Sequence, residues 1–402
     1  MTPVPYDKNR VLKELRICIV YDCLFPWTIG GAERWYRTLV ERLAETGARV
    51  TYLTRRQWEG DPPAIEGVSV IVVMPEADLY RPDGTRKIGP PLRFGWGVFW
   101  WLVRHRSEVD RVRVANFPYF SLLAARAALL GTRKPVDVDW FEVWPLEFWR
   151  RYVGRVAGRF GFAIQALCIR LTDHAFVFWE HTATRLQAFG FDNQLTVLAG
   201  LLPANGRDTA SRLLRSHAEP VALFAGRMIK DKGVLLLPEA IAMARRELPS
   251  LRLVMVGEGP EGSLLQQRCA ELDLAAAVRF PGKVPDNELD ELIAGSSCVV
   301  VASVREGYGL MVVEAAAAGT PSIVAANPEN AAVEHIVQGV NGFVVDPTSA
   351  ALAQGIIAAV AAGDSLRQST IDWYRQRADS MSMNRAAAEV VEIYMIRQDK
   401  KD

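Results

Sequence analysis

Cysteine, histidine and long apolar runs are scarce in this chain of 402 residues. The five cysteines include no Cys-x-x-Cys pair, and the five histidines show no metal-ligand spacing. This usage argues against a disulfide framework or a structural zinc site and is typical of a reducing compartment. The first residues are too polar for a signal peptide, and no apolar run reaches the roughly 18–20 residues of a spanning helix. We therefore expect a cytoplasmic protein without a metal site.

Net charge is also nearly absent. The formal charge is +1, which gives no reason to expect general attraction to nucleic acid. The charges are unevenly distributed, because residues 81–170 hold 16 Lys and Arg against 7 Asp and Glu, together with six of the eleven tryptophans. Half of all residues are hydrophobic, and the length is sufficient for two domains with sizeable cores.

The most informative stretch runs from residue 296 to residue 326. Cys298–Ala302 is short, apolar and β-branched, which predicts a buried parallel strand, and Leu310–Ala318 is predicted to be a helix. A glycine-bearing turn, Glu306–Gly309, lies between them, and Glu314 lies near the start of the helix. Ligands of open α/β sheets bind beyond the carboxyl ends of strands, and a helix N-terminus favours phosphate. Two carboxylates, which only accept hydrogen bonds, suit a partner rich in hydroxyls, such as a nucleotide that carries a sugar.

The order of strand, polar turn and helix recurs at two other places. The first predicted strand of the chain is followed by Gly30 and Gly31, which open a helix and form a second phosphate-facing turn. A strand predicted at Val221–Phe224 is followed by Arg227 and Lys232. Two fixed positive charges can offset the two negative charges of a diphosphate without a metal.

These segments together resemble the retaining glycosyltransferases of family 4, also described as glycosyl transferases group 1, which have the GT-B fold. The stretch REGYGLMVVEAAAAGTP resembles the E-x7-E signature of that family, with Glu306 and Glu314 at the two glutamate positions. The resemblance implies that the first glutamate contacts the donor sugar and the second contacts the ribose. The segment from Arg227 to Lys232 resembles the diphosphate clamp of the family.

The resemblance implies catalytic roles for Arg227, Lys232 and Glu306 and no metal requirement. The donor-binding positions that it implies are Gly30, Gly31, Lys283, Val284, Gly307, Tyr308, Gly309, Leu310 and Glu314. Many family members carry a histidine near the donor sugar, at what corresponds to Phe141 here. The neighbouring Glu142 is a candidate for a sugar or acceptor contact, with a plain strand-end carboxylate as the alternative. The departure at Phe141 puts a histidine-assisted step in doubt.

The expected fold is therefore α/β and of the GT-B type, with two Rossmann-like β/α/β domains facing a cleft and a C-terminal helix that crosses back to the N-terminal domain. Residues 1–200 are expected to form an acceptor-binding domain, which residues 378–402 complete. Residues 201–219 are expected to be a linker, and residues 220–377 to form the nucleotide-sugar-binding domain.

The implied activity is retaining transfer of a hexosyl unit from a UDP- or GDP-sugar to a glycan or a polyprenyl- or lipid-linked acceptor, in cell-surface glycan biosynthesis. The nucleotide sugar is a substrate, so no cofactor is expected. Three alternatives stay open. The GxGxxG pattern of Gly257–Gly262 also occurs in Rossmann dinucleotide sites. Arg279 would suit the 2′-phosphate of NADP, which leaves an NADP-dependent oxidoreductase as one alternative. The missing histidine suits a non-catalytic nucleotide-sugar-binding protein, and a nucleotide-sugar epimerase of the same fold needs no acceptor.

Two segments combine arginines with aromatic residues. Residues 90–106 hold tryptophans flanked by arginines, and residues 149–171, interpreted as one helix, place Val156 and Phe160 on an apolar stripe beside an arginine stripe. Such segments suit an anionic lipid surface, whereas a core helix with a solvated arginine face is the alternative interpretation. We expect peripheral attachment to the inner face of the cytoplasmic membrane.

Overall fold

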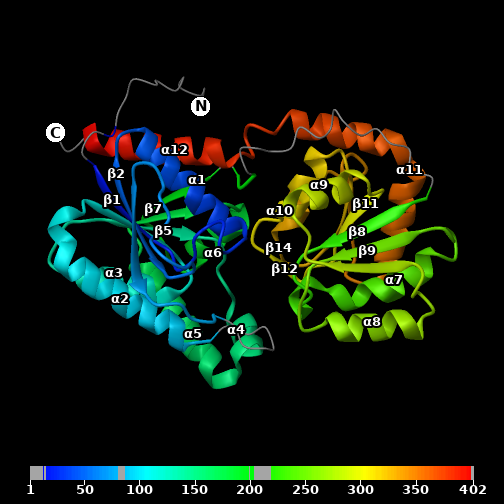
Figure 1. The fold of residues 1–402 in the computed structure, drawn as a ribbon, viewed down its shortest axis with the longest axis horizontal. Coiled ribbons are helices and arrows are strands. Elements are labelled where there is room, and N and C mark those ends of the chain that lie inside the picture. Colours follow the sequence, from blue (N-terminus) through cyan, green and yellow to red (C-terminus); the bar gives the residue numbers. More distant parts are fainter. Residues whose placement is uncertain (1–11, 13–14, 80–86, 199, 203–218, 400–402) are drawn as a thin grey trace. The chain divides into compact units, whose positions relative to one another are not determined.

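The computed structural model describes the chain except for residues 1–11, 13–14, 80–86, 199, 203–218 and 400–402. The described residues divide into two compact units, shown in Figure 1. The described residues of the first unit lie within 12–79, 87–202 and 382–399, and those of the second lie within 219–381. Each unit contains a parallel sheet with helices packed on both faces. The predicted linker falls almost wholly outside the described residues.

The first unit is built on seven parallel strands in the order β3-β2-β1-β4-β5-β6-β7. The strands are β1 (Arg16–Val20), β2 (Arg49–Arg55), β3 (Val68–Met74), β4 (Arg111–Ala115), β5 (Val136–Trp140), β6 (His174–Val177) and β7 (Gln194–Val197). The helices are α1 (Gly31–Glu45), α2 (Gly89–His105), η1 (Arg106–Glu108), α3 (Tyr119–Ala128), α4 (Leu146–Val153), α5 (Arg155–Arg170), α6 (Glu180–Ala188) and α12 (Met383–Asp399). The strand order reverses between β1 and β4, and such a switch point is where open α/β sheets bind ligands.

Strands β4 and β5 bury charges as well as valines, because their residues point alternately to the two faces of the sheet. The valines pack against α2, α3 and α5 (Figure 1). On the other face, Arg111 pairs with Asp137 at 2.7 Å and Arg113 pairs with Asp139 at 2.5 Å, and all four side chains are buried. The hydroxyl of Tyr394 in α12 donates a hydrogen bond to Asp137 at 2.7 Å. The C-terminal helix therefore packs on the first unit, as expected for the GT-B fold.

The second unit has six parallel strands in the order β10-β9-β8-β11-β13-β15, plus the small pair β12-β14. The strands are β8 (Val221–Ala225), β9 (Arg252–Val256), β10 (Val278–Gly282), β11 (Cys298–Val301), β12 (Arg305–Glu306), β13 (Ser322–Ala325), β14 (Glu329–Asn330) and β15 (Gly342–Val345). The helices are η2 (Lys230–Lys232), η3 (Val234–Leu236), α7 (Leu237–Ala244), α8 (Gly262–Glu271), α9 (Asp286–Ala294), α10 (Leu310–Ala317), η4 (Ala331–His335) and α11 (Ser349–Arg375). Helices α7, α8 and α11 pack on one face of the sheet, and α9 and α10 on the other. The strand order reverses between β8 and β11.

The prediction of one helix over residues 149–171 was wrong. The chain breaks at Gly154, whose φ of 92° is left-handed, and forms α4 and α5 instead. The two helices pack closely because α5 presents glycines to α4. A Cβ atom at Gly158 would lie 2.6 Å from the backbone nitrogen of Arg150.

The sequence led us to expect no segment long and apolar enough to span a membrane. Among the described residues, helix α11 meets that criterion by length and composition alone. Gly363 interrupts it with φ 51° and ψ −131°, and Leu352 packs in the core of the second unit. The buried guanidinium of Arg367 donates hydrogen bonds to the carbonyl oxygens of Ala294 and Ser296. In this structure one face of α11 packs against the core of the second unit.

Candidate functional site

The switch point of the second sheet collects the residues that the sequence predicts to be catalytic. Arg227 follows β8 and is exposed, and η2, which ends at Lys232, comes shortly after. Glu306 comes after β11, the direct neighbour of β8 in the sheet. Because the two strands are parallel, these segments leave the sheet at the same edge.

Lys232 and Glu306 are in direct contact. The Nζ atom of Lys232 lies 2.5 Å from Oε1 of Glu306, and the two side chains are 26% and 19% exposed. The hydroxyl of Ser303 donates a hydrogen bond to the same carboxylate oxygen at 2.9 Å. The pair therefore offers a cation that can hold a phosphate beside an acceptor that can bind a sugar hydroxyl.

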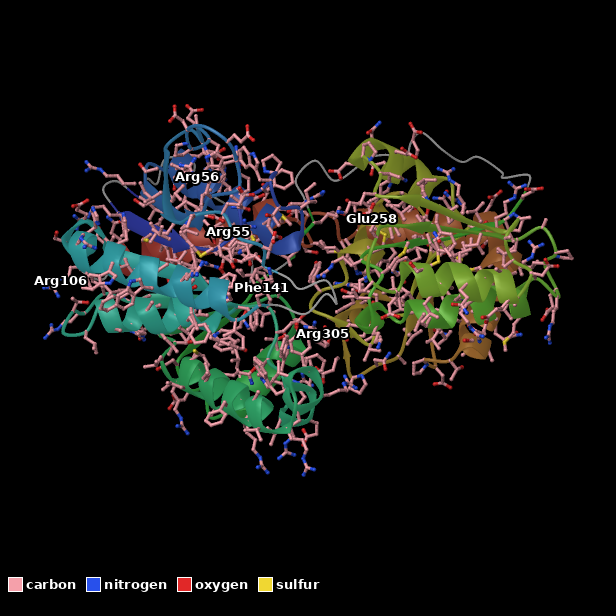
Figure 2. All side chains as sticks on the ribbon, turned by 60° about the horizontal axis from the view of Figure 1, so that its bottom comes forward. Arg55, Arg56, Arg106, Phe141, Glu258 and Arg305 are labelled. Atoms are coloured by element: carbon pink, nitrogen blue, oxygen red, sulfur yellow. The ribbon has the colours of Figure 1, made fainter. Side chains whose placement is uncertain are left out.

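A second ion pair joins the same two loops. The Nη2 atom of Arg305 lies 3.3 Å from Oδ2 of Asp231, and the backbone N–H of Val304 donates to the carbonyl of Asp231 at 2.9 Å (Figure 2 labels Arg305). These contacts hold the neighbours of Lys232 and Glu306 in place. Sequence reasoning missed the roles of Asp231 and Arg305, because only their adjacency to the predicted residues marks them.

The turn before α10 requires glycine at one position. Gly309 has φ 90° and ψ 42°, and a Cβ atom there would lie 2.6 Å from Cα of Ala332. The preceding Tyr308 is buried, with its ring centroid 4.6 Å from that of His335. The turn thus sets the start of α10 at Leu310, whose first amide groups favour an anion.

The structure places the other predicted donor-binding residues of this unit around the same sheet. Gly307 lies in the turn after Glu306, and Glu314 is half-buried in α10. Lys283 is exposed after β10, and its Nζ atom lies 3.5 Å from Oε2 of Glu258. The neighbouring Val284 is half-buried against the core under α9 and α10.

The glycine-rich loop of Gly257–Gly262 is occupied by the chain itself. A Cβ atom at Gly257 would collide with the carbonyl oxygen of Gly226, and one at Gly259 with the carbonyl oxygen of Met228. The backbone N–H of Met228 also donates into this loop. Close packing against the chain itself therefore accounts for the glycines at positions 257 and 259 without a bound dinucleotide.

Gly30 and Gly31 lie at the switch point of the first sheet. Helix α1 begins at Gly31, and Gly30 is its extended N-cap residue. The carboxylate of Glu33 folds back against Gly30 and accepts a hydrogen bond from the hydroxyl of Tyr21 at 3.1 Å. A side chain at position 30 would collide with this carboxylate.

Phe141 and Glu142 follow β5 at the same edge of the first sheet. The ring of Phe141, labelled in Figure 2, stacks on Phe178 with centroids 5.2 Å apart and planes 6° apart. Glu142 accepts a hydrogen bond from the indole Nε1 of Trp144 at 2.6 Å. Position 141, where the family resemblance led us to look for a histidine, therefore holds an aromatic stack.

In the described part of the chain, no group of three or more His, Cys, Asp or Glu side chains is placed to hold a metal ion. The five cysteines are buried thiols. Burial raises the pKa of Cys298 to about 12, which keeps it protonated.

Two family models match the chain in sequence. The model described as Glycosyltransferase Family 4 matches residues 29–199, and the model described as Glycosyl transferases group 1 matches residues 207–376. The chain belongs to these family 4 glycosyltransferases of the GT-B fold.

Individual relatives match to different extents. D-inositol 3-phosphate glycosyltransferase of Streptomyces avermitilis is 37% identical over 153 residues, which is 36% of this chain. The match spans about a third of that relative, 32% of its length. The lipopolysaccharide core biosynthesis glycosyltransferase LpsE of Rhizobium meliloti is 26% identical over 343 residues, 84% of this chain and 87% of LpsE.

Solved structures show the same fold. Sucrose-phosphate synthase of Thermosynechococcus elongatus has a TM-score of 0.77 at 18% identity and covers 96% of this chain and 99% of its own. Anabaena Alr3699/HepE in complex with UDP and glucose has a TM-score of 0.68 at 17% identity and covers 94% and 99%. At these identities the likeness establishes the fold alone.

Proposed function

We propose that the protein transfers a hexosyl unit from a UDP- or GDP-sugar to a glycan or lipid-linked acceptor, with retention at the anomeric carbon. The observation that carries the proposal is the contact of Lys232 with Glu306 at the switch point, next to the start of α10. The family supports a nucleotide-sugar donor, and a structure of this fold holds UDP and glucose.

Each residue has a role in this reaction. Arg227, Lys232 and the first amides of α10 offset the charge that develops on the departing diphosphate, which removes the need for a metal or cofactor. Glu306 and Glu314 accept hydrogen bonds from hydroxyls of the sugar and the ribose, and the loop at Lys283 and Val284 meets the base. The bond from the anomeric carbon to the diphosphate oxygen breaks, a bond to the acceptor oxygen forms on the same face, and a phosphate oxygen takes the acceptor proton.

A panel of nucleotide sugars tests the donor. UDP-glucose, UDP-galactose, GDP-mannose, UDP and GDP are compared by thermal shift, because the tightest binder raises the melting temperature most at equal concentration. Turnover of the best donor is then followed by release of free nucleotide. Lys232→Ala should abolish most turnover, whereas Lys230→Ala, in the same loop but exposed, should not. Failure of every nucleotide sugar to stabilise the protein would contradict the proposal.

Glu314 separates binding from chemistry. Glu314→Gln removes a charge that grips the ribose, so we expect the donor KM to rise several-fold with little change in kcat. A wild-type KM in this variant would contradict the assigned role. Donor binding without any transfer or hydrolysis in the wild-type protein would instead favour the non-catalytic binding protein, which the aromatic stack at Phe141 keeps as the second candidate.

Two apolar stripes on the first unit support membrane contact. The stripe on and just before α2 repeats every four residues and is 39–63% exposed; it consists of Ile88, Leu92, Trp96 and Trp100. The stripe on α5 is 46–68% exposed and consists of Val156, Phe160 and Leu167. Both helices pack on the same face of the sheet, on either side of α3 (Figure 1).

Arginines accompany both stripes. The guanidinium of Arg104 lies 5.1 Å from the ring centre of Trp100, and Arg155 and Arg159 are exposed on α5. Exposed apolar side chains flanked by arginines match the interface of a membrane that contains anionic lipids. We therefore propose that the protein attaches to the inner face of the cytoplasmic membrane and takes a lipid-linked acceptor there.

A further inference from the structure

Arg55 lies at the carboxyl end of β2, and no carboxylate among the described residues forms an ion pair with it. Its Nη1 atom lies 3.4 Å from the carbonyl oxygen of Arg56, and its Nη2 atom lies 3.9 Å from the Sγ atom of Cys23. The Nε atom is buried and makes no hydrogen bond. The guanidinium is half-buried, so its charge is partly removed from water, while its two described contacts are long and uncharged.

Several other arginines of the first unit are paired with carboxylates. Arg16 contacts Asp110 at 2.6 Å, Arg126 contacts Asp173 at 2.6 Å, and the two arginines of β4 are paired inside the sheet. These guanidinium groups contact acidic side chains, whereas the contacts described for Arg55 are a carbonyl oxygen and a thiol. Planar guanidinium groups match phosphate and carboxylate geometry through paired hydrogen bonds.

The surroundings of Arg55 are held in place. The side-chain oxygen of Gln57 accepts hydrogen bonds from the backbone of Leu24 at 3.2 Å and from the hydroxyl of Thr28 at 2.5 Å. The side-chain nitrogen of Gln57 donates to the carbonyl of Arg55 at 3.2 Å. These bonds fasten the loop after β1 to the end of β2, next to the turn that leads to Gly30.

The same loop presents an aromatic face. Trp27 is 42% exposed, and its ring centroid lies 5.4 Å from that of the buried Trp58. An exposed indole supported by a second indole is a platform on which the apolar face of a sugar ring can pack. Arg56, labelled with Arg55 in Figure 2, is exposed and adds a second positive charge at the end of β2.

We propose that Arg55, Arg56 and Trp27 form an acceptor subsite for a saccharide that carries an anionic oxygen group, either a phosphate ester or a carboxylate. The subsite lies at the carboxyl edge of the first sheet, one strand away from the Gly30–Gly31 turn, which is the edge where this fold class binds ligands. The inference rests on the proposed transferase function, because it assigns the bound saccharide as the acceptor.

Binding of small probes tests the subsite. Glucose 6-phosphate, glucuronate and glucose are titrated by calorimetry while UDP or GDP, whichever stabilises the protein, saturates the donor site. We expect one or both anionic probes to bind about 10- to 100-fold more tightly than glucose, because charge-assisted hydrogen bonds are stronger than neutral ones. A response to glucose 6-phosphate identifies a phosphorylated acceptor, and a response to glucuronate identifies a uronic acid. Equal binding of all three probes overturns the proposal.

Strand β2 supplies a matched control, because it begins with the exposed Arg49 at the opposite edge of the sheet. Arg55→Gln should lose the advantage of the anionic probe, Arg55→Lys should lose part of it, and Arg49→Gln should keep it. Trp27→Ala should weaken glucose 6-phosphate or glucuronate but not inorganic phosphate. Equal losses of anionic-probe affinity in the Arg49 and Arg55 variants overturn the proposal. If Arg55→Gln does not fold, the affinity of the Arg55→Lys variant is compared with that of Arg49→Gln instead.

Nucleotide binding separates this inference from the proposed function. The Arg55 variants should bind UDP or GDP as the wild-type protein does. If no nucleotide binds the wild-type protein, the transferase proposal fails, and the anionic probes are then titrated in a Lys232→Ala background. If adding Arg55→Gln to Lys232→Ala abolishes binding of the anionic probes, the result still supports an anion site at Arg55. Unchanged binding of the probes in this double variant overturns the anion site.

Discussion

The Nζ atom of Lys232 lies 2.5 Å from the Oε1 atom of Glu306, although 74 residues separate the two in the chain. The contact joins the loop after β8 to the loop after β11 across the switch point. In this arrangement the carboxylate holds the ammonium group at the place where a diphosphate would approach.

A double-mutant cycle on this pair is the first prediction. Lys232→Ala and Glu306→Ala should each lower kcat by about 10²–10³, or about 2.7–4 kcal/mol, as for other preorganised electrostatic groups. Because the two groups act as a unit, the double variant should lose clearly less than the product of the single losses. Initial rates of nucleotide release measure all four proteins. Fully multiplicative losses would show that the two groups act independently.

Gly309 yields a prediction about the turn before α10. Gly309→Ala must hold a left-handed backbone and also place Cβ 2.6 Å from Ala332, so we expect a loss of about 1–3 kcal/mol and weaker donor binding. Gly339→Ala is the matched control, because its φ of 72° is also left-handed but a Cβ atom there meets nothing within 4 Å. Thermal melting and donor KM are measured for both. A Gly309 variant no worse than the Gly339 variant would contradict the close approach.

His174 predicts how stability depends on pH. Its Nδ1 atom lies 2.6 Å from Nη2 of Arg397, which only donates, so the imidazole is neutral and its Nε2–H donates to Thr196 at 2.8 Å. Burial lowers the pKa of His174 to about 3, from an ordinary value near 6.5. Between these two values the unfolded chain binds a proton that the folded chain does not. This group therefore lowers the free energy of unfolding as pH falls below about 6.5, by about 1.4 kcal/mol per pH unit, and has little effect above pH 7.

Unfolding in urea between pH 4.5 and 7.5 measures this contribution. Tryptophan fluorescence follows the first unit, because only Trp373 of the eleven tryptophans lies in the second unit. His174→Gln should show a shallower decline than the wild-type protein, and His105→Gln serves as the control for removing a histidine. Identical slopes in the wild type and the His174 variant would exclude the assigned protonation state.

The apolar stripes predict binding to vesicles. Flotation with vesicles that contain about a third phosphatidylglycerol should recover the wild-type protein, and pure phosphatidylcholine vesicles should not. Phe160→Ser together with Trp96→Ser should abolish most of the binding. Leu130→Ser is the matched control, because Leu130 is 75% exposed but lies outside both stripes. Equal recovery of all these proteins would argue against a lipid-facing role for α2 and α5.

Most of the strands were predictable from the sequence, and so was the placing of Lys232 and Glu306 at the same edge of one sheet. Runs such as Cys298–Val301 are apolar and β-branched, and they are followed by glycine-bearing turns, so local chemistry identifies them as buried parallel strands. The family resemblance was confirmed by the matching models over both halves of the chain. The short edge strand β7 was missed, because Gln194–Val197 is only four residues long and partly exposed.

Features that depend on distant neighbours were not predictable. Several glycines occur around the break between α4 and α5, and the sequence does not say which one breaks the helix. In the structure Gly154 provides the left-handed break, whereas Gly158 allows α5 to pack closely on Arg150 of α4. The ion pair of Asp231 with Arg305 requires two loops to meet in space. That no carboxylate of the described residues pairs with Arg55 becomes visible only in the folded structure.

Helix α12 has a consequence for the order in which the protein is made. Residues 219–381 form the second unit without any later segment, so that unit needs no contact with α12 to be complete. The strands of the first unit precede the second unit in the chain, yet Asp137 accepts a hydrogen bond from the hydroxyl of Tyr394, which is synthesised near the end. Until translation reaches α12, the half of the protein that was synthesised first remains the unfinished half.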